Sequence, residues 1–142
     1  HLNRATGSEC DDVMIDAPPG VSCPAINAVM DADAIVLVTE PTPFGLYDLT
    51  LAHKAFAQLE IPMGVVVNRS NIGPRDVQAH CRKTGLPILA EIPFQREIAE
   101  AYAQGHVIVD ALPSTRPLFE SLARRIMALA GFRTPRGEAC HA

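Results

Sequence analysis

Residues 34–45 read AIVLVTEPTPFG, and this stretch decides the class of fold. Its first half is an uninterrupted apolar run, which is typical of a β-strand that helices cover on both faces. Glu40 and two prolines then end the run and predict a loop at the carboxyl end of the strand. Beyond the loop, apolar residues recur at helical spacing as far as residue 60, which indicates an amphipathic helix. The stretch therefore predicts a buried strand, a loop and a helix that packs back onto the sheet.

The same pattern repeats on both sides of this stretch. An apolar run at 13–15 predicts a short strand, followed by a turn and by a short helix after Ser22. Further apolar runs predict strands at 64–68 and 88–92. Helices are expected over 73–83, over 95–104 and from Ser114 to about Leu129, whereas 107–109 is too short to assign. This alternation predicts an α/β fold of three layers, with a parallel sheet between two layers of helices.

Composition narrows the class of protein. The 142 residues are 48% hydrophobic and 20% charged, which are ordinary values for one globular domain. A net charge of -4 without a basic patch argues against nucleic-acid binding. The apolar runs are far shorter than the roughly 18 residues that a membrane span needs, and no apolar leader follows His1. We therefore expect a cytoplasmic protein with no nucleic-acid or membrane partner.

Cysteines, histidines and arginines do not predict a site of their own. The four cysteines contain no CxxC pair, which favours isolated reduced thiols. Cys23 is expected to be buried, and the alternative is a redox-sensitive or cluster-facing thiol. His53 and His80 fall on predicted helices without the spacing of metal ligands. Arg124 and Arg125 are expected on the solvated face of the last helix.

Polar or turn residues follow each predicted strand. Asp16, Glu40, Asn68 and Pro93 stand at four such carboxyl ends, where open α/β sheets bind their ligands. Asp16, with Gly20 in the turn behind it, suits a phosphate-handling site. Its carboxylate can hold Mg²⁺ through water, and a glycine-containing turn can move as the γ-phosphate comes and goes.

Two other interpretations of Asp16 stay open at this point. It can be a plain turn aspartate, or it can belong to a phospho-acceptor receiver domain, as the acidic pair at 11–12 suggests. The receiver interpretation is the weaker one, because that pair precedes the same strand and no lysine ends a later strand.

Four motifs in the same order resemble the MinD/ParA/Mrp-type P-loop ATPases. IDAPPG (15–20) is similar to their switch II segment, and VTEPTPFGLYDL (38–49) is similar to the landmark that follows it. VVVNRS (65–70) resembles the adenine-recognition strand, and AEIPF (90–94) with REIA behind it resembles the loop on the far side of the base. The TEPTPFG sequence (39–45), with Cys23-Pro24 upstream, looks most like that of the subgroup that carries an inserted ferredoxin domain.

The resemblance implies a role for individual residues. Asp16 and Gly20 would be catalytic, with Asp16 on the Mg²⁺ side, and Pro18 would shape the switch and border the nucleotide. Asn68 would hydrogen-bond adenine, since an amide offers both a donor and an acceptor. Gln95 stands where family members usually have an acidic residue, so the base or ribose contact there would be altered. The other implied nucleotide-binding residues are Glu40, Pro41, Arg69 and Pro93.

The phosphate loop itself is not in this sequence, because none of the 142 residues forms a GxxxxGK[ST] motif. We expect a leader or truncated end at 1–11, the C-terminal part of an ATPase domain at 12–131 with its sheet incomplete on the N-terminal side, and a flexible tail at 132–142. The phosphate loop, and possibly 4Fe-4S cysteines, would lie upstream.

The isolated chain is then expected to bind ATP poorly and to be inactive. The parent would use ATP and Mg²⁺, act as a homodimer or self-associate, and serve an iron–sulfur or redox partner. The alternative is a shortened, non-catalytic docking module that retains the fold.

Overall fold

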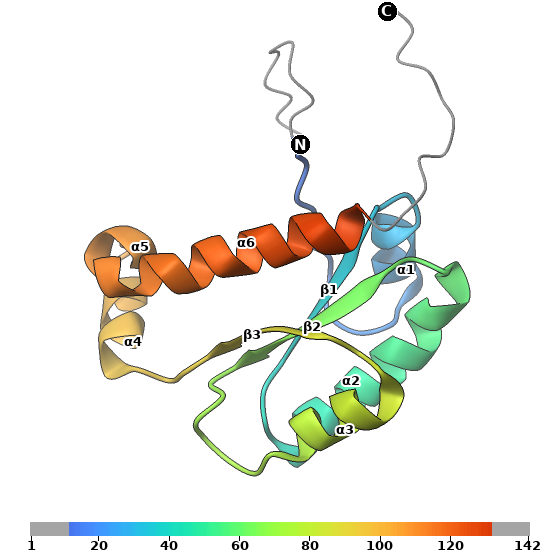
Figure 1. The fold of residues 1–142 in the computed structure, drawn as a ribbon, viewed down its shortest axis with the longest axis horizontal. Coiled ribbons are helices and arrows are strands. Elements are labelled where there is room, and N and C mark those ends of the chain that lie inside the picture. Colours follow the sequence, from blue (N-terminus) through green and yellow to red (C-terminus); the bar gives the residue numbers. More distant parts are fainter. Residues whose placement is uncertain (1–11, 132–142) are drawn as a thin grey trace, which may run out of the picture.

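The computed structural model describes residues 12–131 and has three parallel strands in the order β1-β2-β3 (Figure 1). The strands are β1 (Ile35–Thr39), β2 (Met63–Asn68) and β3 (Ile88–Ile92). The helices are α1 (Cys23–Val29), α2 (Pro43–Phe56), α3 (Asp76–Thr84), α4 (Arg96–Ala103), α5 (Ile108–Ala111) and α6 (Arg116–Ala130). Short 3-10 turns at Ala57–Leu59 and Pro113–Thr115 join α2 to β2 and α5 to α6. The predicted α/β fold with a parallel sheet is confirmed.

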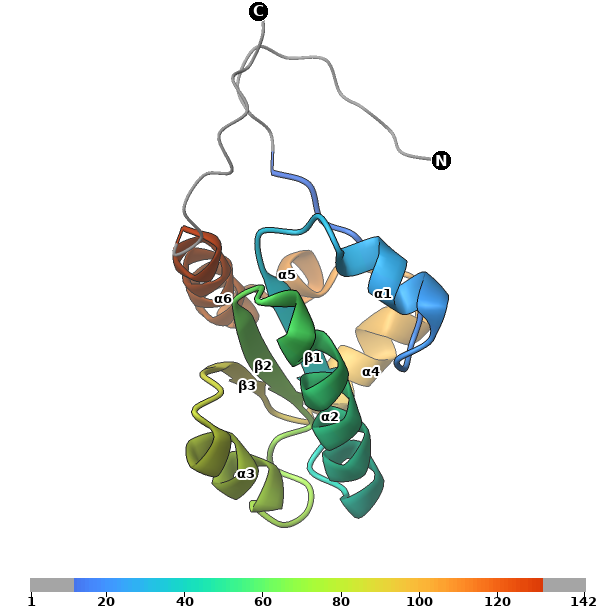
Figure 2. The ribbon, with the colours of Figure 1, turned by 90° about the vertical axis from the view of Figure 1, so that its right-hand side faces the viewer.

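Helices cover both faces of the sheet and form the outer two of three layers (Figure 2). One core lies between the sheet and α1, α2 and α3, where Val65 and Val67 of β2 are fully buried against Leu49, Phe56 and Val77. A second core lies on the opposite face, where α6 packs on β2 and β3 with Leu118, Leu122 and Ile126 among its contacts. Because both faces of β2 are covered, it is apolar along its length, as the sequence predicted.

The start of α2 fixes the loop that follows β1. Thr42 caps the helix, since its Oγ1 accepts a hydrogen bond from the Gly45 amide at 2.9 Å, and Pro43 occupies the first turn. The Thr39 hydroxyl also donates to the Gly45 carbonyl at 2.9 Å. A Cβ at Gly45 would collide with the Glu40 carbonyl oxygen, so only glycine fits there. The first loop of the site is therefore held tightly against its own helix.

The predicted strand at 13–15 is wrong. These residues are irregular in the structure, with Val13 72% and Met14 89% exposed. Within residues 12–131, β1 pairs with β2 alone, so residues 13–15 do not join the sheet at the other edge of β1. Apolar character favours a strand only when a partner strand completes its ladder.

Smaller expectations also change. Residues 108 and 109, for which the sequence predicts no structure, belong to α5, and Val107 is its N-cap. The last helix begins at Arg116 behind a 3-10 turn that contains Ser114. Cys23 is exposed, not buried, because it lies at the amino end of α1, where Ala25 is the buried residue.

Arg125 does not lie on a purely solvated face. Its guanidinium donates to the Ile88 and Leu89 carbonyls at 3.1 and 2.9 Å. It thereby covers part of the outer edge of β3.

None of the helices within residues 12–131 is long and apolar enough to cross a bilayer. The predicted leader at 1–11 and tail at 132–142 lie outside the described residues.

Candidate functional site: the loops at the carboxyl edge of the sheet

Three loops meet where the strands end. They are residues 40–42 after β1, 69–75 after β2 and 93–95 after β3, and we call them the three-loop cluster (lower left in Figure 1). The Ser70 amide donates to the Ile92 carbonyl at 2.9 Å, which extends the β2–β3 pairing into the loops. Gly73 packs so closely on the Pro41 carbonyl that a Cβ would collide with it. The three strands thus deliver three predicted site segments to one place.

Asn71 ties the second loop to the third. Its Oδ1 accepts a hydrogen bond from the Phe94 amide at 2.6 Å, and its Nδ2 donates to the Phe94 carbonyl at 3.2 Å. One side chain therefore satisfies both backbone groups of a residue 23 positions away. The Phe94 backbone is fixed beside Pro93, which is half-buried.

Arg69 joins all three loops through its side chain. Its Nε lies 3.4 Å from Glu40 Oε1, and its guanidinium carbon lies 5.9 Å from the centre of the Phe94 ring. Both charged side chains are about half exposed, so each contact stabilises the fold by only about 0.2–1 kcal/mol. Arg69 also has a left-handed backbone with φ of 50°, which costs a non-glycine residue about 1 kcal/mol or more.

Asn68 stands at the tip of β2 with part of its hydrogen-bonding capacity free. Its Oδ1 accepts a hydrogen bond from the Arg69 amide at 3.0 Å, which fixes the direction of the amide group. Its Nδ2 has no hydrogen bond to any residue in the described part of the chain. An amide held in this way can donate to a ring nitrogen that accepts in adenine but carries a proton in guanine, which is N1.

The other predicted nucleotide-binding residues divide by exposure. Pro41 is buried, and its carbonyl packs on Gly73, so it shapes the loop. Gln95 is exposed at the amino end of α4, and its side chain does not cap the helix. Gln95 is thus placed at the rim of the cluster with a free amide.

Asp16, Pro18 and Gly20 belong to a second region, residues 12–22, which we call the pre-helix segment. All three are exposed, and Asp16 forms no ion pair or hydrogen bond with any residue between 12 and 131. Gly20 has φ of 84°, and a Cβ there would meet nothing within 4 Å. The structure therefore gathers Glu40, Asn68, Arg69 and Pro93 but leaves the predicted catalytic pair outside their contacts.

Asp16 fits a Mg²⁺ site only if waters and substrate phosphates supply the other ligands. No group of three His, Cys, Asp or Glu side chains between residues 12 and 131 could enclose a metal. Mg²⁺ is commonly held by one or two carboxylates together with waters and substrate phosphates, and a free, exposed carboxylate is compatible with that mode.

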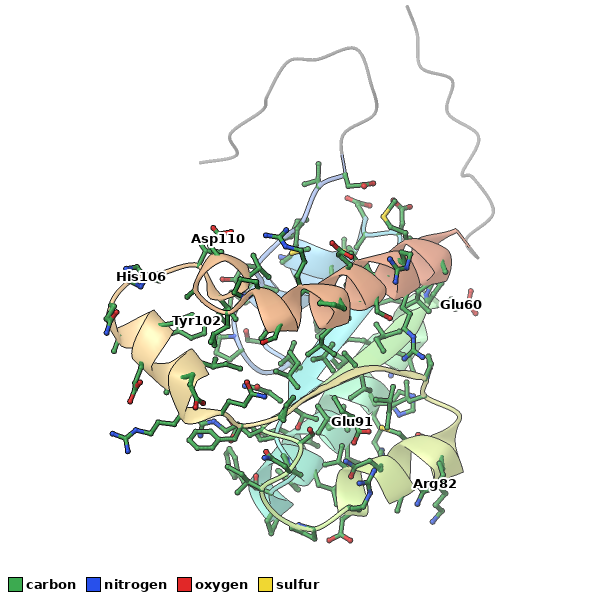
Figure 3. The ribbon with its side chains drawn as sticks, turned by 60° about the vertical axis from the view of Figure 1, so that its left-hand side comes forward. Glu60, Arg82, Glu91, Tyr102, His106 and Asp110 are labelled. Carbon is green, nitrogen blue, oxygen red and sulfur yellow. The ribbon has the colours of Figure 1, made fainter. Side chains whose placement is uncertain are left out.

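Other polar groups serve the fold. Glu91 of β3 faces α3 (Figure 3), where it accepts hydrogen bonds from Gln78 at 2.7 Å and Arg75 at 3.4 Å. Tyr102, His106 and Asp110 lie on the side of the molecule away from α3 (Figure 3), where α4 and α5 border a shallow hollow.

Two titratable groups between residues 12 and 131 have shifted pKa values, and neither lies in the three-loop cluster. Burial, and then the neighbouring His80 ring at 6.4 Å, lower the pKa of His53 between α2 and α3. Burial raises the pKa of the Cys81 thiol against the smaller opposing effect of a backbone hydrogen bond. Cys81 is therefore an inert core residue.

Sequence reasoning missed Asn71 and Gly73. Gly73 was predicted to open the helix at 73–83, but α3 begins at Asp76 and Gly73 lies in the loop before it. Only the packing of two loops far apart in sequence gives these positions a specific role.

The fold and the three-loop cluster define a class: open α/β proteins that bind a ligand where parallel strands end. The family profile of ParA, described as NUBPL iron-transfer P-loop NTPase, matches residues 2–127. The chain therefore belongs to this family of P-loop NTPases.

Relatives and a solved structure agree with this assignment. An uncharacterised protein of Methanocaldococcus jannaschii is 31% identical over 96 residues, which cover 68% of this chain and 32% of the relative. Iron-sulfur cluster carrier proteins of Aquifex aeolicus and Rickettsia felis are 30% and 28% identical, over 74% and 79% of this chain. The alignments span 33% and 36% of those two proteins.

The MinD cell division protein of Aquifex aeolicus superposes with a TM-score of 0.62 and 21% identity. The match covers 86% of this chain and 54% of that protein. It supports the MinD-like fold, and the chain spans about a third of the length of its curated relatives.

Proposed function

We propose that this chain forms the adenine-binding side of a Mg²⁺-dependent ATPase that handles iron–sulfur clusters. The observation that carries the proposal is Asn68, whose amide is oriented by the Arg69 backbone and whose Nδ2 is free, at the centre of three fixed loops. The family assignment supports a nucleoside triphosphate as the ligand.

The residues of the cluster have separate tasks in this proposal. Asn68 donates a hydrogen bond to the adenine ring, and the half-buried Pro93 lies along the base. Arg69 and Glu40 border the nucleotide and neutralise each other, which leaves the phosphates to charges outside the cluster. Gln95 lies at the rim of the cluster, where family members usually have a carboxylate. Its neutral amide can either donate or accept a hydrogen bond.

Asp16 and Gly20 act on the phosphate side. The exposed Asp16 carboxylate would hold Mg²⁺ through water, and the bound ion would screen the charge of the phosphates. Gly20, where an added Cβ would meet nothing within 4 Å, lets the pre-helix segment move when the γ-phosphate is lost.

The cargo proposed is an iron–sulfur cluster, because two relatives carry the name iron-sulfur cluster carrier protein. Cys81 is buried and Cys23 is a single exposed thiol, so the described residues do not supply a cluster-binding set. The proposal places the 4Fe-4S ligands in sequence beyond these 142 residues, with a cytoplasmic redox or iron–sulfur protein as partner.

The test is calorimetric titration of the full-length gene product with MgATP and MgGTP. Asn68→Ala should weaken MgATP binding about tenfold, since it removes one or two base contacts, and should leave MgGTP binding unchanged. Asn27→Ala, an exposed asparagine on α1, is the matched control and should bind both nucleotides as wild type does. Equal MgATP affinity in Asn68→Ala and wild type would remove Asn68 from the site.

A second candidate function is a non-catalytic docking module that self-associates. It is favoured by the edge of β1 that pairs with no strand among the described residues and by Val38, which is 68% exposed on the same face of β1 as Val36. Light scattering distinguishes the two. A 142-residue chain that is dimeric without nucleotide supports docking, whereas a full-length protein that dimerises only with MgATP supports the ATPase.

An ATPase assay on the purified chain tests whether the 142 residues are active alone. They contain no GxxxxGK[ST] motif, so on our proposal they bind MgATP weakly and do not hydrolyse it. Turnover by the purified chain would count against this part of the proposal.

A further inference from the structure

The Asn71 side chain continues the sheet beyond the last strand residues. Backbone pairing of β2 with β3 ends at the hydrogen bond from the Ser70 amide to the Ile92 carbonyl. One residue further on, the carboxamide of Asn71 takes over the role of a backbone, with its oxygen on the Phe94 amide and its nitrogen on the Phe94 carbonyl. A carboxamide can do this because it has the donor and acceptor geometry of a peptide group.

This pair of hydrogen bonds joins the second and third loops directly. The Arg69 guanidinium also lies over the Phe94 ring, at 5.9 Å, but this contact is partly exposed and weak. Phe94 lies between Pro93 and Gln95, so its backbone position also sets where these two neighbours stand. Without Asn71, the Phe94 amide and carbonyl would bond to water and the loop would be held only at its ends.

The position of Asn71 links the tie to the base. Asn68 and Asn71 are on the same loop side of β2, three residues apart, and Pro93 and Phe94 are on the loop opposite. The Asn71 carboxamide thus sets the separation between the residue proposed to bond adenine and the proline proposed to lie along it. On our proposal, adenine contacts both Asn68 and Pro93 only when that separation is kept.

We infer that Asn71 is a positioning residue that gives the site its selectivity for adenine nucleotides. This rests on the proposed function, and it adds a residue that touches no nucleotide itself. Asn71 acts on the base and not on the phosphates, so its loss lowers the ratio of ATP to GTP affinity and leaves GTP binding as it was.

The experiment compares wild type with Asn71→Ala, Asn71→Asp and Asn27→Ala in the full-length gene product. MgATP and MgGTP affinities are measured by calorimetry, and amide exchange at Phe94 is measured by mass spectrometry. Asn71→Ala should weaken MgATP about tenfold, leave MgGTP within twofold, and speed exchange at Phe94. Asn27→Ala should match wild type in all three.

Asn71→Asp provides a second variant because it keeps the acceptor for the Phe94 amide, whereas a charged oxygen replaces the donor to the Phe94 carbonyl. Its ATP-to-GTP ratio should fall between those of wild type and Asn71→Ala. It also serves if Asn71→Ala does not fold.

Three outcomes overturn the inference. Faster exchange at Phe94 with an unchanged ATP-to-GTP ratio would make Asn71 a turn stabiliser only. Equal loss of ATP and GTP binding would indicate general loosening of the site. A wild-type protein without preference for ATP would remove the proposed function, and the inference with it.

Discussion

The three-loop cluster and the pre-helix segment were predicted as parts of one site, yet the structure treats them differently. The cluster is held by Asn71, by the contact of Gly73 with Pro41 and by the extended pairing of β2 with β3. The pre-helix segment, 12–22, is exposed almost throughout and contributes no strand. Strand pairing fixes the position of the loop that follows the strand. Where the residues before a loop are not paired in the sheet, the loop is not fixed in this way.

The largest expected contrast is between two aliphatic residues. Leu49→Ala, in the core between α2 and the sheet, should lower the free energy of unfolding by about 2–5 kcal/mol. Ile15→Ala, in the exposed segment, should change it by less than about 0.5 kcal/mol. Urea unfolding followed by circular dichroism measures both. A loss near that of Leu49→Ala at Ile15 would mean that the segment packs as a strand.

Two glycines with positive φ give the next contrast. Gly73→Ala should destabilise the fold by about 2 kcal/mol or more, because it adds a collision with the Pro41 carbonyl to backbone strain at φ of 102°. Gly20→Ala has the strain without a neighbour and should cost about 1 kcal/mol at most. Urea unfolding measures both variants. Equal losses in the free energy of unfolding would show that the cluster loops rearrange as easily as the pre-helix segment.

Neighbouring arginines on α6 test the outer edge of β3. Arg125→Ala removes hydrogen bonds to two carbonyls and should cost about 1 kcal/mol. Arg124→Ala, on an exposed side chain, should stay within about 0.5 kcal/mol of wild type. If both variants unfold like wild type, the Arg125 contacts do not contribute to stability in solution.

The smallest expected effect is pH-dependent and confined to the helices behind the cluster. Because the pKa of His53 is lowered in the folded protein, the unfolded chain takes up the proton first as pH falls. Stability from this group is complete above the ordinary histidine pKa of about 6.5 and is lost as pH falls below it. His53→Gln should therefore show a smaller drop in melting temperature between about pH 7 and pH 5. An unchanged drop would exclude His53 as its source.

Much of the fold was predictable because local pattern and tertiary context agree. Residues 34–45 gave β1, the loop and the start of α2, since a strand covered on both faces must be apolar and Thr42 with Pro43 suits a helix start. Gly85, with φ of 76°, ended α3 as expected. At 13–15 the same apolar pattern failed, because pairing depends on a strand that local sequence does not specify.

The site was predictable only in part. Strand ends predicted where Glu40, Asn68 and Pro93 would gather, but their roles in binding a nucleotide stay predictions. Asn71 was not predictable, since its partner lies 23 residues away and only the geometry of both loops makes the pair. Cys23 illustrates the converse, because a cysteine near a turn is buried or exposed according to which face of α1 it occupies.

The central claim is that the three-loop cluster is fixed within this chain, whereas the pre-helix segment is not. Amide hydrogen exchange tests this claim most directly. It would compare the 142-residue chain with the full-length gene product, with and without MgATP. We predict slow exchange at 69–75 and 92–96 in both proteins, and fast exchange at 12–22 in the shorter chain that slows in the full-length protein with MgATP. Slow exchange at 12–22 in the shorter chain, or no effect of MgATP there in the full-length protein, would contradict the account.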